Sequence, residues 1–114
     1  MLSREQILAA NDRPSEEVDV PEWGGSVRVA SMSGTTRDRF ETSIVTAAGE
    51  TDLTNMRAKL VAACVVGEDG LPMFTQADVE ALGHKSAVAL ERVVQVAQRL
   101  NRMGNKALEE LRGN

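Results

Sequence analysis

The chain has 114 residues and a formal net charge of -4, enough for one small domain with a modest core and too few for two. Hydrophobic residues make up 42% of it and charged residues 26%, an ordinary globular composition that excludes a chain disordered throughout. The acidic balance argues against a protein whose main role is to coat nucleic acid.

The first predicted elements are a short helix and a β-hairpin. Ser3 followed by Gln6 is a capping-box pattern that opens a helix over "SREQILAA". Valines alternate with polar residues on both sides of "PEWGG", which predicts a β-hairpin at about 18–30. Trp23 precedes two glycines at its tip. Because a two-stranded hairpin is marginal by itself, Trp23 either packs back on the helices or projects into a neighbouring subunit.

Helices are predicted for most of the remaining chain. Ser33 or Thr35 can cap the first of them, Thr75 with Asp78 caps a short one, and Ser86 begins the longest. Apolar spacing and these caps place the helices at 36–47, from 53 to near 67, at 76–82 and at 86–102, with a terminal piece at 105–112. The expected fold is mainly α, a small domain of five or six helices with an N-terminal β-hairpin. Scarce aromatic residues, 3% of the chain, also favour a helical core.

We expect a single domain over residues 1–114 with four consecutive parts. These are an N-terminal helix and approach segment at 1–15, the β-hairpin at 16–31, a helical body at 33–103 and a C-terminal helix or tail at 104–114.

The sequence shows no pattern of catalytic, cofactor-binding or metal-binding residues. Cys64 lies inside the longest apolar run, "LVAACVV", and is expected to be a buried core thiol. His84 falls in a turn between helices, and no zinc-ligand spacing is present. We therefore expect a protein that is not an enzyme. That apolar run is far too short to span a bilayer, so we also expect a cytoplasmic protein with no membrane partner.

The segment from 74 to 102 has the layout of a helix-turn-helix, a short helix, a glycine-containing turn and a longer helix. Arg92, Arg99 and Arg102 share one side of the predicted helix 86–102, opposite its apolar stripe. This basic face is either a solvated surface, a surface for an acidic or helical protein, or a DNA-binding surface. A small DNA-binding regulator is thus the alternative function.

Several stretches together resemble a known family. They are "VDVPEWGG" followed by "MSGTTRDRFE", and "EDG" followed by "FTQADVEALG". With "LSREQILAANDRP" and the helix that follows "GHKS", they resemble the tail assembly chaperones of long-tailed bacteriophages and prophages over nearly the whole chain. The terminal "NKALEELRGN" matches least.

The resemblance implies a helical, non-enzymatic phage protein that acts in the host cytoplasm during virion morphogenesis. Such chaperones bind the tape measure protein, keep it soluble and promote assembly of the tail tube around it. Many are also made in a longer, frameshifted form that recruits the tail tube protein, and this chain resembles the shorter form. Self-association is expected, whereas nucleic acid, a membrane and a cofactor are not.

Methionines are candidates for an adaptable partner-binding surface, because their flexible side chains tolerate varied partner shapes. The competing interpretation is that they fill the core of this small domain. The candidate residues for partner binding or self-association are Trp23, Met56, Met73, Arg92, Arg99, Arg102 and Met103.

Overall fold

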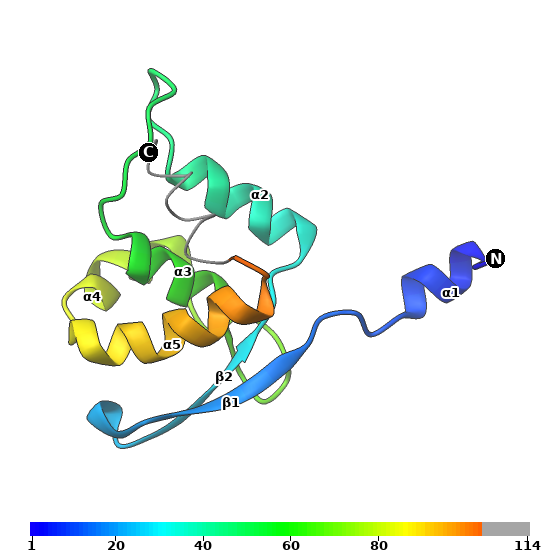
Figure 1. The fold of residues 1–114 in the computed structure, drawn as a ribbon, viewed down its shortest axis with the longest axis horizontal. Helices are drawn as coiled ribbons and strands as arrows, with labels where there is room; N and C mark the ends of the chain where they lie inside the picture. Colours follow the sequence, from blue (N-terminus) through cyan, green and yellow to red (C-terminus); the bar gives the residue numbers. More distant parts are fainter. Residues whose placement is uncertain (104–114) are drawn as a thin grey trace.

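A computed structural model describes residues 1–103, in which five α-helices accompany one three-stranded antiparallel sheet (Figure 1). The helices are α1 Arg4–Ala9, α2 Gly34–Ser43, α3 Met56–Cys64, α4 Val79–Gly83 and α5 Ala87–Leu100. The strands are β1 Ser15–Val20, β2 Gly25–Ala30 and β3 Val65–Val66, and 3₁₀ turns span Pro21–Trp23 and Gln76–Asp78. The predicted terminal piece at 105–112 lies outside the described residues.

The predicted hairpin is confirmed, and its first strand begins earlier than expected, at Ser15. Val18 pairs with Val27 and Val20 with Gly25 across the two strands. The tip is the 3₁₀ turn followed by Gly24, whose φ of 76° is a left-handed conformation that glycine adopts without strain. The side chains of Val18 and Val20 are buried on one face, as period-two alternation requires.

A third strand corrects the expected fold class. The sequence predicts the end of a helix at residues 65 and 66, but they form β3, where Arg28 of β2 pairs with Val66 and Val29 with Val65. The sheet order is β1-β2-β3, so the fold is not purely helical with a lone hairpin. Two successive apolar residues show no periodicity, which is why the sequence could not distinguish a short buried strand from a helix end.

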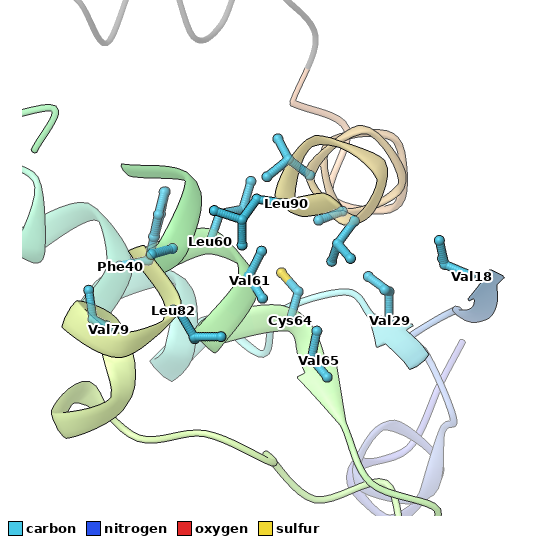
Figure 2. Packing of buried hydrophobic residues seen from close by; sticks show 14 of the residues in the cluster. Val18, Val29, Phe40, Leu60, Val61, Cys64, Val65, Val79, Leu82 and Leu90 are labelled. Atoms are coloured by element: carbon cyan, nitrogen blue, oxygen red, sulfur yellow. The ribbon is translucent and has the colours of Figure 1, made fainter. Parts of the chain in front are cut away.

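One buried cluster joins the sheet to the helices. Helix α5 packs against α3 and across β1 and β2, and its buried residues include Leu90, Val93 and Ala97. Figure 2 shows Leu60 and Val61 of α3 close to Leu90, with Val29 of β2 beyond Cys64. The marginal hairpin is therefore stabilised by helix α5, which covers its apolar face.

Helix α2 ends four residues before the predicted end. It stops at Ser43, and the chain then forms a narrow loop in which Val45 bridges Thr51 and Gly49 has a φ of 81°. The amide of Asp52 donates to the carbonyl of Ile44 over 2.7 Å, which closes the base of this loop. The next helix consequently starts at Met56 rather than at 53.

Helix α1 projects away from the rest of the molecule (Figure 1). Its predicted capping box is present, with the Ser3 amide donating to Gln6 Oε1 over 2.9 Å and the Gln6 amide donating to Ser3 Oγ over 3.2 Å. None of its residues is buried. Among the described helices, none has the length and apolar character that crossing a bilayer requires.

Candidate partner-binding surfaces

Trp23 packs back toward the helices from the tip of the hairpin. Its side chain is half-buried and lies against the buried cluster. The structure therefore shows Trp23 packed against its own chain. A contact of Trp23 with a neighbouring subunit stays a prediction, because part of its side chain is still exposed.

Two of the three candidate arginines, Arg92 and Arg99 on α5, are ion-paired with the hairpin. Arg92 Nε donates to Glu22 Oε1 over 2.8 Å, and its Nη2 donates to Glu22 Oε2 over 2.9 Å. A hydrogen bond from Arg92 is the main cause that lowers the pKa of the Glu22 carboxyl below its ordinary value. Arg99 forms a single-contact ion pair with Glu16 of β1, through its Nη2 and Glu16 Oε2. These ion pairs link the helix to the hairpin, so Arg92 and Arg99 contact hairpin carboxylates in this structure.

The third arginine has a backbone role at the end of α5. Arg102 has a φ of 57°, and its amide donates to the carbonyl of Arg99 over 3.2 Å. The amide of Met103 donates to the carbonyl of Gln98 over 2.7 Å. These two bonds form a Schellman motif. The turn directs Met103 inward, where it is 1% exposed. Met103 is therefore a core residue rather than a partner-binding one.

Asn101 carries no signal in the sequence pattern, but it fixes the end of α5 to the segment that follows β2. Its Oδ1 accepts a hydrogen bond from the Met32 amide over 2.7 Å, and its Nδ2 donates to the Ala97 carbonyl over 2.7 Å. The same Nδ2 lies 3.5 Å from Cys64 Sγ. One amide side chain thus links three parts of the chain.

Met56 lines a groove between α3 and α5. The groove has a volume of about 470 Å³, and the residues around it include Leu53, Leu90 and Val94. Met56 is half-buried and Leu53 is 37% exposed, so apolar surface is accessible there. An ion pair of Arg57 Nε with Glu91 Oε2, 3.0 Å long, borders the groove.

Met73 lies elsewhere, in the turn that follows β3. Its side chain is 53% exposed and that of Leu71 is 63% exposed. The turn is held by hydrogen bonds from the Gly67 amide to the Leu71 carbonyl, 2.9 Å, and from the Met73 amide to the Val65 carbonyl, 3.2 Å. Leu71 and Met73, which we call the turn patch, form a small exposed apolar surface on an anchored loop. The candidate residues therefore do not form one common site.

Cys64 lies at the centre of the core, as expected. Its side chain is fully buried, and burial raises the pKa of its thiol to about 11. A thiol with that pKa is protonated near neutral pH and is a poor nucleophile. Among residues 1–103, no group of three or more His, Cys, Asp or Glu side chains is arranged to hold a metal ion.

Comparison with known proteins finds a likeness in structure only. No protein-family model and no curated protein matches the sequence. Among solved structures, the fold is similar to that of the bacteriophage HK97 tail assembly chaperone, with a TM-score of 0.55 and 20% sequence identity. The alignment covers 82% of this chain and 94% of that chain. The chain thus has a fold like that of a tail assembly chaperone.

Proposed function

We propose that this chain is a phage tail assembly chaperone that binds the tape measure protein, keeps it soluble and promotes assembly of the tail tube around it. The observation that carries the proposal is the fold shared with the HK97 tail assembly chaperone over 82% of the chain. The sequence resemblance described above, from the hairpin motif to "FTQADVEALG", supports it from separate evidence. We further propose that the chain is not an enzyme and acts in the host cytoplasm.

The turn patch is the surface proposed to contact the tape measure protein. A long helical partner presents an apolar stripe, and a small chaperone binds such a stripe with exposed apolar side chains. Leu71 and Met73 are both more than half exposed on a loop that backbone hydrogen bonds hold in place. Each copy contributes a small area, so many copies on one partner give the total affinity.

Co-expression with the tape measure protein from the same phage tests this contact. The tagged chain is expected to purify together with the tape measure protein, and a Leu71→Ser/Met73→Ser variant is expected to retain much less of it. Val45→Ser is the matched control, because Val45 is also an exposed apolar residue, at 47%, on a different loop. Equal recovery by the wild-type chain and the turn-patch variant would show that the partner binds elsewhere, and no recovery by either would oppose the proposed function.

A longer, frameshifted form is the proposed link to the tail tube protein. Expressing the natural gene with its downstream DNA and an N-terminal tag allows both products to be detected by blot and intact mass. The proposal expects a minor extended product, and that this product binds the tail tube protein whereas the 114-residue chain does not. Tube binding by the shorter chain alone would contradict this division of roles.

A further inference from the structure

The groove between α3 and α5 combines buried apolar residues with charged and polar ones. Leu60, Leu90 and Val94 line it and are buried. A wholly apolar occupant would leave the polar groups of this lining without partners, which costs free energy. An amphipathic occupant therefore suits the groove better. The polar lining residues include Arg57, Lys85, Glu91 and Gln98.

The described chain ends close to one end of this groove. Gln98 lines the groove in the last turn of α5, and Ala87 lines it in the first. The distance along the helix between these two residues is about 16 Å. The Schellman turn at Arg102 and Met103 ends α5, and residues 104–114 follow it directly. A segment of that length spans about 16 Å as a helix and about 36 Å when extended, so it can reach the far end of the groove.

The sequence of residues 104–114, "GNKALEELRGN", has the amphipathic pattern that this lining requires. Leu108 and Leu111 are three positions apart, the spacing of neighbours on one side of a helix. Glu109 and Glu110 lie between them in sequence and fall on other sides. The segment therefore offers apolar side chains in one direction and carboxylates in another.

We infer that residues 104–114 turn back along α5 and dock in the α3–α5 groove of their own chain. Leu108 and Leu111 pack on its apolar residues. A segment that runs back in this way brings its later residues toward the start of α5, where Lys85 borders the groove. Lys85 is exposed and has no ion pair among residues 1–103, so its charge complements Glu109 and Glu110. The docked segment covers the groove, and a partner gains access to it only by displacing the segment.

Alkylation of a cysteine placed in the groove of the full chain tests this contact. Met56→Cys provides the reporter, because Met56 lines the groove, whereas native Cys64 is fully buried and reacts little. Adding Leu108→Ser/Leu111→Ser should speed alkylation of the reporter by at least about tenfold. Val88→Cys is the control, because Val88 is 59% exposed but does not line the groove, and its rate should not change. Equal rates for the reporter with either segment overturn the inference.

Dilution and charge reversal test the remaining parts of the inference with the same reporter. Protection by a segment of the same chain should not change with protein concentration, and protection that disappears on dilution would show that a second copy supplies the segment. Lys85→Glu should speed alkylation of the reporter, and adding Glu109→Lys/Glu110→Lys should slow it again. An unchanged rate in the Lys85→Glu chain contradicts the proposed charge contact. These measurements need only the purified chain, so their outcome does not depend on whether the chain binds the tape measure protein.

Discussion

Replacing Asn101 by alanine should destabilise the folded chain by about 2 to 3 kcal/mol. The substitution removes the acceptor of the Met32 amide and the donor to the Ala97 carbonyl, both at 2.7 Å. Loss of the bond to Ala97 costs roughly 1 kcal/mol net, and the part-buried Met32 amide left without its acceptor costs about 1 to 2 kcal/mol, the lower part of the range for an unpaired buried donor. The Met32 side chain is only 9% exposed, so water has little access to replace the lost acceptor.

Urea unfolding followed by circular dichroism measures this loss. The midpoint should fall at an unchanged slope, and the melting temperature should fall by roughly 10 to 20 °C. Gln95→Ala is the control, because Gln95 is exposed on the same helix and alanine is a good helix former. A loss below about 0.5 kcal/mol, the low end for one such bond, would refute the argument that Asn101 fixes the end of α5.

Four further predictions concern other positions in the fold. Arg102→Gly should raise the free energy of unfolding by about 1 kcal/mol, measured in urea, because glycine adopts the left-handed conformation at φ 57° without the strain that a side chain adds. Burial raises the folded-state pKa of Cys64 from 9.0 to about 11, so the free energy of unfolding should fall as pH rises through that range, and native Cys64 should resist alkylation at pH 8. Arg92→Ala should raise the pKa of Glu22 in an NMR titration, because its main hydrogen-bond donor is lost. Trp23→Ala should lower the free energy of unfolding by about 2 kcal/mol if packing is its main role, whereas reduced self-association at unchanged stability would show the subunit contact instead.

Elements whose signals are local could be predicted from the sequence. The hairpin follows from alternating valines around "PEWGG", and the capping box of Ser3 with Gln6 predicted the start of α1. Ser86 was predicted to begin the longest helix, and its Oγ accepts from the Ala89 amide over 3.3 Å. In each case, residues close in sequence decide the conformation.

Features that depend on distant residues could not be predicted in this way. Strand β3 forms because β2 provides its partner, and two valines alone carry no period. Glu22 and Arg92 are separated by 70 positions, so helical spacing identified the arginine side of α5 but not the hairpin carboxylates that face it. The end of α2 at Ser43 depends on the bonds of the following loop rather than on helix propensity.

The candidate surfaces show the same limit. Nothing in the sequence distinguishes Met73 from Met103 as a partner-binding residue, yet the side chain of Met73 is 53% exposed and that of Met103 is 1% exposed. The difference arises because the Schellman turn at Arg102 directs the chain inward, and that position holds arginine rather than the glycine that signals such a turn. The exposed apolar side of α1 was not identified, because an apolar helix face normally indicates contact with the core.

The most direct test of the proposed function is the soluble fraction of the tape measure protein with and without this chain. The tape measure protein of the same phage would be produced alone, with the wild-type chain and with the Leu71→Ser/Met73→Ser variant, and its soluble fraction would be quantified after centrifugation. A chaperone should make it soluble in a complex that holds several copies of the chain, and the variant should restore much less. A tape measure protein that is equally soluble without the chain, or that aggregates equally with it, would contradict the proposed function.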